Sequence, residues 1–351
     1  MSPPSAASSP RAPDFPHIRA GHCGSGALRD LLEFRGLDYG SGPLSEGSVF
    51  GLAGGLGFLF VELPGIEPPI YLVGRGAELE RDIAGHLGFG VEVRQTGDPD
   101  EGWAWVRDEI DNGRPPLVWA DIAELEYLRV RMQNTRHDIV VVGYDEQAGV
   151  AWVADNDRDE LQRCSLESLA RARNSQGFPG PNRNTTFFYS WPERLKDPRD
   201  AVRDGIARTV ENMESGGAMS ADAATIWSPG TAGADGVDSF LRSYPNWRGA
   251  FGDQLPAALR SLGVFIVKAG TGGAMFRSLH ATFLHDAADL LDDRQLGVLA
   301  RTYDGLAEAW RQLAETAAAD DHQGGSEVVV AIGALEHTGV AQMRSWVRGR
   351  S

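Results

Sequence analysis

Apolar residues in the first half of the chain recur in two patterns that alternate. After Cys23 they have the spacing of an amphipathic helix, and Gly36 ends that helix. Further helical patterns cover residues 77–87 and 100–112. Short apolar runs between turn residues predict strands at 58–63, 70–73, 91–95, 117–120, 137–145, 150–154 and 186–190. This mixture predicts an α+β domain over residues 14–190, whose sheet is closed by its last strand.

The second half of the chain is almost wholly helical in its pattern. Apolar residues at helical spacing predict helices at 199–215, 236–243, 253–262, 273–291, 294–318 and 325–347. Residues 191–198, with two prolines, are predicted to be a linker, and residues 199–351 an all-α domain. Residues 1–13 are rich in Ser, Pro and Ala and lack an apolar core segment, which predicts a disordered tail rather than a signal peptide.

Two glycine-rich stretches fit either a ligand-binding loop or a close contact between packed backbone segments. A dinucleotide-binding loop follows a strand and opens a helix, whereas the glycines at 51–57 precede a strand. We expect them to let backbone segments pack closely, with lining of a site beside Cys23 as the alternative. The stretch 270–273 precedes the helix that carries Arg277. Packing is favoured there too, over an anion site at the helix N-terminus.

Three residues that the predicted elements bring together are the candidate catalytic residues of the chain. Cys23 stands at the start of a helix, where free N–H groups and the positive dipole end favour the thiolate. His137 begins one strand of a predicted hairpin and Asp155 directly follows the other, so both lie at the same end of it. Asp155 can fix the His137 ring through one nitrogen and leave the other for the thiol. The pattern predicts a Cys–His–Asp triad, although each residue alone also fits a structural role.

Composition agrees with a two-domain enzyme. The chain has 351 residues, of which 42% are hydrophobic and 23% charged, and about 150 residues per domain is usual. Two cysteines, Cys23 and Cys164, are too few for a disulfide framework, which is typical of a reducing compartment. His280 and His285 are five residues apart with no cysteine nearby, so no metal site is predicted. No apolar run reaches the roughly 18–20 residues of a membrane helix, and we expect a cytoplasmic protein without a membrane partner.

The chain resembles a known family through several of these segments. They are His22–Cys23 with its helix, the glycine-rich stretch from Leu44 to Phe58, the strand Pro116–Asp121 followed by Leu125 and Tyr127, and the hairpin of His137 and Asp155. The N-terminal half resembles the papain-like cysteine fold in its bacterial double-glycine-peptidase variety. It is more closely similar to the N-terminal domain of the butirosin-biosynthesis acyltransferase family. Through Gly270–Arg277 and Phe283–Ala287, the second half resembles the uncharacterised helical domain that follows it.

The resemblance implies acyl transfer through a thioester. Cys23 would take the acyl group from a carrier protein and pass it to a small-molecule amine, with His137 as base, giving an amide in the biosynthesis of a specialised metabolite or antibiotic. Backbone N–H groups at Gly24 would form part of the oxyanion hole. The papain-like fold adds a side-chain amide where this chain has His17, so His22 is the candidate for the second donor. No cofactor is implied, because the phosphopantetheine belongs to the donor protein.

Further residues are candidates for binding the substrates. Glu46 and Tyr127 lie in segments that carry the resemblance, and Asp121 is a candidate to hold the acceptor amine, with capping of its loop as the alternative. The formal charge of −16 argues against a nucleic-acid partner and permits a cationic substrate. Just before His137 stand three basic residues, Arg129, Arg131 and Arg136. Guanidinium groups match phosphate oxygens, so they predict contact with phosphopantetheine or an acidic carrier, unless they form the solvated side of an edge strand.

Three alternative functions remain open at this point. The same triad with water as acceptor makes a peptidase, an amidase or a thioesterase, and an internal nucleophile makes a cyclase. The peptidase alternative is weakened because no secretion signal or removable pro-region is evident. A module that binds without catalysis, with a structural cysteine, is an alternative of a different class. The helical domain is predicted to cover the cleft, bind the carrier or build a homo-oligomer.

Overall fold

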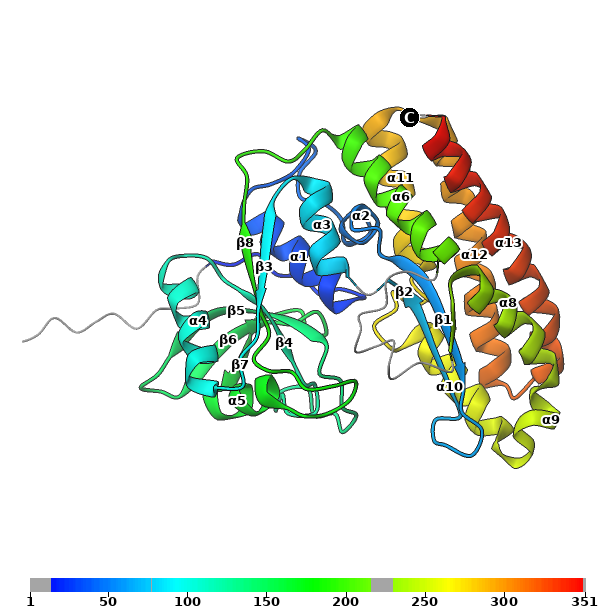
Figure 1. Cartoon of the computed structure of the whole chain (residues 1–351), viewed down its shortest axis with the longest axis horizontal. Coiled ribbons are helices and arrows are strands. Elements are labelled where there is room, and N and C mark those ends of the chain that lie inside the picture. The colour runs from blue at the N-terminus through cyan, green and yellow to red at the C-terminus, as the bar shows by residue number, and fades with distance from the viewer. Residues whose placement is uncertain (1–13, 77, 216–229, 350–351) are drawn as a thin grey trace, which may run out of the picture. The chain divides into compact units, whose positions relative to one another are not determined.

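The chain folds into two compact units, and each unit is discontinuous in sequence. The computed structural model describes residues 14–76, 78–215 and 230–349 (Figure 1). The first unit is Met1–Leu37 with Gly90–Trp191, and the second is Asp38–Phe89 with Pro192–Ser351. Residues 38–89 therefore belong with the C-terminal segment and not, as the local pattern suggested, with the other residues of 14–190. The predicted tail at 1–13 lies outside the described residues.

The first unit is built on a six-stranded antiparallel sheet. Its order is β3 (Gly90–Arg94), β8 (Thr186–Ser190), β4 (Leu117–Ala120), β5 (His137–Asp145), β6 (Val150–Ala154) and β7 (Gln162–Ser165). The predicted hairpin of β5 and β6 is confirmed, with Val140 opposite Ala154. The prediction that the strand at 186–190 closes the sheet is wrong, because β8 pairs with β3 along one side and with β4 along the other. The short, polar strand β7 was not predicted.

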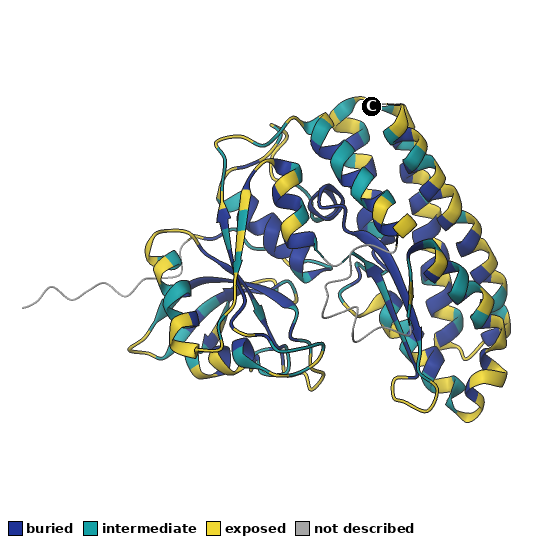
Figure 2. Cartoon of the chain, in the orientation of Figure 1, coloured by how far each residue is buried: buried dark blue, intermediate teal, exposed yellow. Residues whose placement is uncertain are grey.

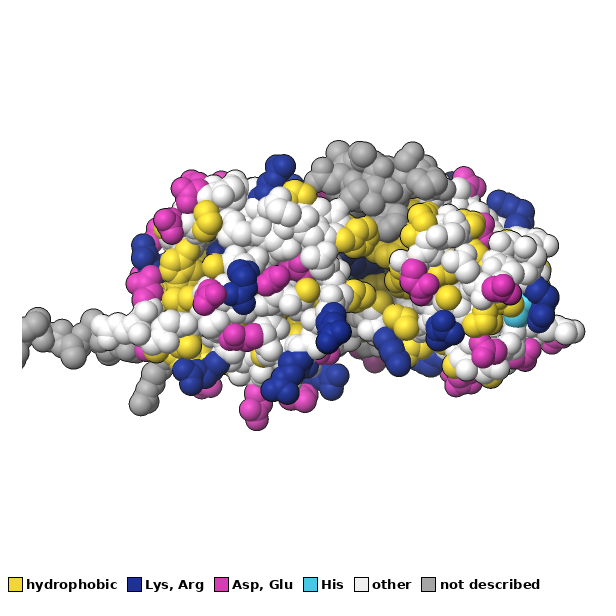
Figure 3. Space-filling view, turned by 90° about the horizontal axis from the view of Figure 1, so that it is seen from below, with side chains coloured by type: hydrophobic (Ala, Val, Ile, Leu, Met, Phe, Trp, Pro, Cys, Tyr) yellow, Lys and Arg dark blue, Asp and Glu magenta, His cyan; other side chains and the backbone are white. Residues whose placement is uncertain are grey.

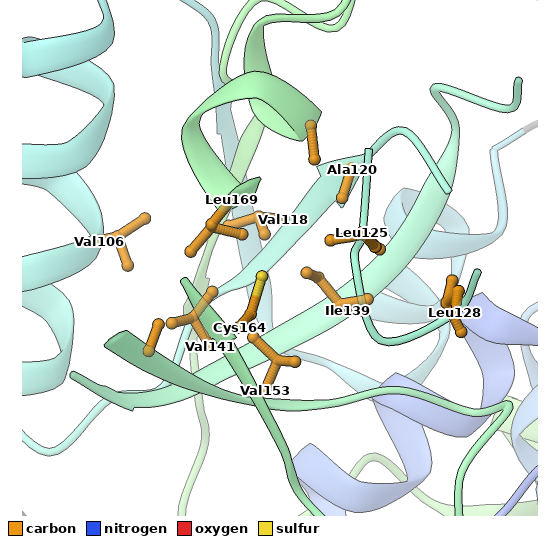
Figure 4. Close-up of a cluster of buried hydrophobic side chains, with 12 residues drawn as sticks. Val106, Val118, Ala120, Leu125, Leu128, Ile139, Val141, Val153, Cys164 and Leu169 are labelled. Carbon is orange, nitrogen blue, oxygen red and sulfur yellow. The ribbon is translucent and has the colours of Figure 1, made fainter. Parts of the chain in front are cut away.

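One face of this sheet carries the main apolar core of the unit. Helices α4 (Pro99–Asp111) and α5 (Leu166–Asn174) contribute Val106 and Leu169 to a cluster with side chains of β4, β5, β6 and β7 (Figure 4). Cys164 lies within it, fully buried. Burial of one Val or Leu side chain stabilises a fold by about 1.5–3 kcal/mol. This core thus holds the strands in register and gives Cys164 a packing role.

Helix α1 (Cys23–Phe34) packs against β5 and is almost entirely buried (Figure 2). Its apolar side chains Leu28, Leu31 and Leu32 are at most 1% exposed. Gly36 has a φ of 65° and ends the helix as predicted, while the Leu37 N–H donates to the Leu32 carbonyl. The start of α1 is thereby held beside the sheet.

The second unit combines a small sheet with long helices, and the described residues after 198 are largely helical, as predicted, apart from one two-residue strand. Its sheet has the order β2 (Ile70–Arg75), β1 (Leu56–Glu62) and β9 (Thr231–Ala232). Its helices are α2 (Glu46–Leu52), α3 (Leu79–Leu87), α6 (Pro198–Ser215), α8 (Gly233–Ser243), α9 (Trp247–Phe251), α10 (Leu255–Val267), α11 (Arg277–Leu291), α12 (Arg294–Ala318) and α13 (His322–Arg348), with short turns η1 (Tyr244–Asn246) and η2 (Gly252–Gln254). Helix α11 starts later than predicted, because Met275 and Phe276 have φ values of 52° and 66°.

Glycines in the second unit allow helix α2 to lie very close to α11. An added Cβ at Gly51 would come within 1.9 Å of the Phe283 ring, and one at Gly47 within 2.5 Å of Thr282. In the second glycine-rich stretch, a Cβ at Gly272 would meet Leu279 at 2.8 Å. Both stretches therefore serve packing, which confirms the favoured interpretation of each.

A buried ion pair joins three parts of the second unit. The Arg277 guanidinium is fully buried and donates to Glu336 Oε1 at 2.8 Å, and to the carbonyls of Gly57 and Gly74 in the sheet strands. The indole N–H of Trp310 donates to the same Glu336 oxygen at 3.0 Å. Arg277 thus links α11 to α13 and to both β1 and β2, and its charge is paired with Glu336 inside the core.

Candidate functional site

All three residues of the predicted triad lie in the first unit, and the fold places the thiol first. Cys23 is the first residue of α1, and the His22 side chain caps that helix by accepting from the Ser25 N–H at 3.2 Å. N–H groups of the first helical turn, including that of Gly24, have no acceptor within their helix. Their partial positive charge is directed at the thiol and at any oxyanion formed beside it.

His137 and Asp155 form a hydrogen-bonded pair. Their Nε2 and Oδ2 atoms are 3.0 Å apart, and both residues are buried. The hairpin register explains this closeness, since Val140 opposite Ala154 brings the residue after β6 beside the start of β5. His137 also interacts electrostatically with Cys23, and each residue shifts the pKa of the other. The histidine therefore links the thiol to the carboxylate, with Nδ1 as the nitrogen left for sulfur.

The electrostatics of the three residues favour an ion pair. Burial raises the pKa of the Cys23 thiol, but the imidazoles of His22 and His137 outweigh it and hold that pKa well below its usual value. Burial lowers the pKa of His137, yet Asp155 and Cys23 together raise it well above its usual value. Burial also opposes the charge on Asp155, while His137 lowers the Asp155 pKa overall. These shifts favour thiolate, imidazolium and carboxylate together.

Tyr127 lies behind Asp155, where it orients the carboxylate. Its hydroxyl donates to Asp155 Oδ2 at 2.8 Å, and the Asp157 N–H donates to Oδ1 at 3.1 Å. Burial and the Asp155 charge raise the pKa of Tyr127 well above its usual value, so the phenol remains a donor. The substrate-binding role that the sequence suggested for Tyr127 stays a prediction beside this contact.

The segment before Cys23 is tied to the turn that carries Asp155. Ala20 and Asn156 exchange two hydrogen bonds, of 3.0 Å from the Ala20 N–H and 3.2 Å from the Asn156 amide. His17 bridges the same regions, with Nδ1 2.6 Å from Asp30 Oδ2 and Nε2 3.1 Å from the Arg158 carbonyl. Both ring nitrogens of His17 are therefore engaged, and His17 links the segment before Cys23 to helix α1 and to the turn after Asp155.

A further ionisable residue, which contacts the thiol, was missed from the sequence. The Asp138 side chain is 1% exposed, and its Oδ2 lies 3.5 Å from Cys23 Sγ. Asp138 pairs with Trp119 in the sheet, next to His137. The sequence did contain a signal for this contact. Successive side chains of a strand point to opposite faces of the sheet, so the residue after a catalytic histidine faces a helix packed on the other face. Asp138 thus joins the site from the strand that packs against α1.

Asp121 caps its loop. It is fully buried, and its Oδ1 accepts from the N–H groups of Ala123 and Asn134, both at 3.1 Å. Its Oδ2 accepts from the Ser175 hydroxyl at 2.6 Å. These contacts favour the capping alternative over a contact with the acceptor amine.

The three arginines before His137 lie in different surroundings. Arg136 stacks on Trp119, with the guanidinium 4.1 Å from the ring centroid. Arg129 and Arg131 are exposed in an irregular loop, and the φ of 56° at Arg129 shows that the edge-strand alternative is wrong. A phosphate contact for these residues stays a prediction. The same holds for Glu46, which begins α2 in the second unit.

Other kinds of site find little support in the part of the chain that the structure describes. Within it, no three His, Cys, Asp or Glu side chains gather in a way that would hold a metal ion. None of the described helices combines the length and apolar character needed to span a bilayer. On the face drawn in Figure 3, Lys and Arg side chains are interspersed with Asp and Glu side chains.

Alkylation of Cys23 is expected to remain fast in mildly acidic solution. A lowered thiol pKa means that thiolate is lost only as the pH falls through that lower value, whereas a free thiol loses about tenfold in thiolate per pH unit below about 8.5. We expect the iodoacetamide rate of the Cys164→Ala variant to change little between pH 7 and pH 6, while N-acetylcysteine slows about tenfold. Mass spectrometry of the Cys23 peptide gives the rate, and a parallel tenfold fall would contradict the ion pair.

Comparisons with known families divide the chain between two matches. A model described as butirosin biosynthesis protein H, N-terminal, matches residues 22–156. A model described as a domain of unknown function, DUF4872, matches residues 167–341. A search of curated proteins finds no match. The first match includes Cys23, His137, Asp138 and Asp155.

Proposed function

Because this chain carries the N-terminal domain of butirosin biosynthesis protein H followed by DUF4872, as its sequence led us to expect, we propose that it is a cysteine-dependent acyltransferase. The observation that carries the proposal is the contact series from Cys23 through His137 to Asp155 at the start of a buried helix. A helix-borne cysteine against a sheet that supplies histidine and acid is the arrangement of papain-like enzymes. We therefore include a papain-like first unit in the proposal.

The proposed reaction has two halves. In the first, the Cys23 thiolate attacks the carbonyl carbon of a carrier-protein thioester, the carrier thiolate leaves, and His137 gives it a proton. In the second, an amine attacks the Cys23 thioester, a C–N bond forms, the C–S bond breaks, and His137 accepts a proton from nitrogen. The N–H groups at the start of α1 stabilise the oxyanion of each half, a contribution of about 3–4 kcal/mol for a single donor in other enzymes.

Amide formation is favoured over hydrolysis by the family and by the site. The name of the matched family refers to the biosynthesis of butirosin, and we propose that this chain likewise acts in the biosynthesis of a specialised metabolite with an amine acceptor. Asp138 adds an acidic group beside the nucleophile, which suits a cationic acceptor better than water. The same triad could instead transfer the acyl group to water, and the experiment below distinguishes this hydrolysis from transfer to an amine.

Acylation by a small thioester tests this proposal. We expect the protein with S-acetyl-N-acetylcysteamine, an analogue of the end of a phosphopantetheine arm, to gain one acetyl group on Cys23. The adduct should persist in buffer and disappear when propylamine is added, with formation of N-propylacetamide. Intact-mass measurements follow the adduct over time. An adduct that clears equally fast without amine would indicate a hydrolase, and no adduct on Cys23 would contradict the proposal.

A further inference from the structure

Among the described residues, Asp138 is an ionisable side chain in contact with the Cys23 sulfur that takes no part in either half of the proposed reaction. Its Oδ2 atom lies 3.5 Å from Sγ, and its side chain is 1% exposed. Asp155, by contrast, is engaged with His137 and Tyr127 and reaches the thiol only through the histidine. The site therefore contains two carboxylates with different partners, one on the base and one on the nucleophile.

The contact between sulfur and carboxyl depends on whether Cys23 is acylated. Two negative charges this close in a buried site repel strongly, so Sγ and Oδ2 share one hydrogen in the free enzyme. Acylation replaces the thiolate by a neutral thioester, which neither repels a carboxylate nor donates a hydrogen to it. Acylation therefore removes the repulsion that opposes ionisation of Asp138, together with the hydrogen-bonding contact of Asp138 with sulfur.

Proton counting shows what an amine acceptor requires of such a group. An aliphatic amine arrives as an ammonium ion at neutral pH, and it must lose one proton before it can attack and a second one after the C–N bond has formed. His137 accounts for one of these protons. Water needs a single base, because it attacks from its neutral form. A site for transfer to ammonium therefore needs a second proton acceptor within reach of the carbon bonded to Sγ.

We propose that Asp138 is this second acceptor, and that its carboxylate forms the binding site for a primary ammonium group of the acceptor. This inference rests on the proposed function. The attacked carbon is bonded to Sγ, so a carboxylate that touches Sγ is close to the incoming nitrogen. Its burial strengthens the attraction between ammonium and carboxylate.

The protons balance over the whole cycle. Asp138 loses a proton to solvent on acylation and then takes one from the ammonium ion. The neutral amine attacks, the C–N bond forms and the C–S bond breaks, and His137 takes the second proton. The enzyme returns to a Cys23 thiolate, a His137 imidazolium and a protonated Asp138. The net reaction consumes a thioester and an ammonium ion and yields an amide, a carrier thiol and one proton.

The Asp138→Asn variant separates this role from the rest of the mechanism. The variant keeps the size and polarity of the side chain but cannot accept a proton, and it is acylated with S-acetyl-N-acetylcysteamine before each nucleophile is added. We expect the rate of acylation, and the rate at which methoxyamine clears the adduct, to change less than about threefold, because methoxyamine is neutral at pH 7. Clearance by propylamine, an ammonium ion at that pH, should fall on the order of 10²-fold, the usual contribution of a general base.

A control variant and the comparison of the two nucleophiles distinguish a proton-accepting role of Asp138 from a structural role. Asp145→Asn removes a carboxylate from the far end of the same strand and should react like the wild type. Equal losses with propylamine and methoxyamine in Asp138→Asn would show a merely structural role and overturn the inference, as would no loss with either. Failure of the wild type to form any adduct on Cys23 contradicts the proposed function itself.

Discussion

Substitution of Cys23 by alanine is expected to abolish the acyl adduct and to lower amide formation by about 10⁴- to 10⁶-fold, the range found when single members of a catalytic triad are removed. The thiolate is the group that bonds to the acyl carbon, and Asp155, the residue whose side chain is hydrogen-bonded to His137 in the described structure, cannot replace it as a thioester-forming nucleophile. Amide release from S-acetyl-N-acetylcysteamine and propylamine, followed by chromatography, measures the effect. Because the change removes one sulfur atom from a partly exposed position, the thermal unfolding midpoint should hardly move.

The second cysteine of the chain provides the matched control. Cys164 is buried in the apolar core of the first unit, where burial raises its pKa to about 11. Alanine at position 164 should therefore leave the adduct and the amide rate within a few-fold of the wild type. Amide formation that survives in Cys23→Ala but is lost in Cys164→Ala would show that Cys164, and not Cys23, is the nucleophile.

Substitution of Arg277 by methionine is expected to destabilise the second unit by about 3–5 kcal/mol, the cost of breaking a buried ion pair from one side. Methionine fills much of the same volume, but it leaves the Glu336 carboxylate without its counter-charge and two strand carbonyls without a donor. Burial together with the Arg277 charge lowers the pKa of the neighbouring His280 to about 3, so this ring is neutral in the wild type and Arg277 is the cation that faces Glu336. Denaturant unfolding followed by circular dichroism measures the loss.

Two further variants give this result its interpretation. Arg277→Met combined with Glu336→Gln should recover a large part of the loss, because the uncompensated charge is gone and Trp310 keeps its acceptor. Arg311→Met removes the arginine of an exposed pair with Glu308, whose side chains are 43% and 74% exposed, and should cost at most about 1 kcal/mol. If all three variants were equally stable, the buried pair would not be the element that joins α11, α13 and the sheet.

Local patterns were sufficient for elements whose signal lies within their own residues. Helix α12 spans the predicted residues 294–318, because a long amphipathic repeat identifies itself without reference to the rest of the fold. The β5–β6 hairpin was found for the same reason, and with it the closeness of His137 to Asp155. That these residues catalyse a reaction stays a prediction until Cys23 is acylated.

Other features depend on contacts that a local pattern does not contain. Strands β1 and β2 have ordinary strand patterns, and nothing in them indicates which sheet they join. Helix α2 is rich in glycine and has no strong intrinsic preference for helix, so its formation depends on its close packing against α11. Asp138 was overlooked because its importance arises from a helix placed beside it, through a contact between residues 115 positions apart.

The interleaving of the two units has a consequence for how the protein is made. The backbone passes between them three times, after Leu37, after Phe89 and after Trp191. On the ribosome, β1 and β2 emerge early but have to wait for the helices from residue 192 onward before their sheet is covered. The first unit can complete its sheet as soon as β8 appears. The thiol site is thus assembled while the β1–β2 segment still lacks its partners, and one cut in the chain cannot yield two self-sufficient halves.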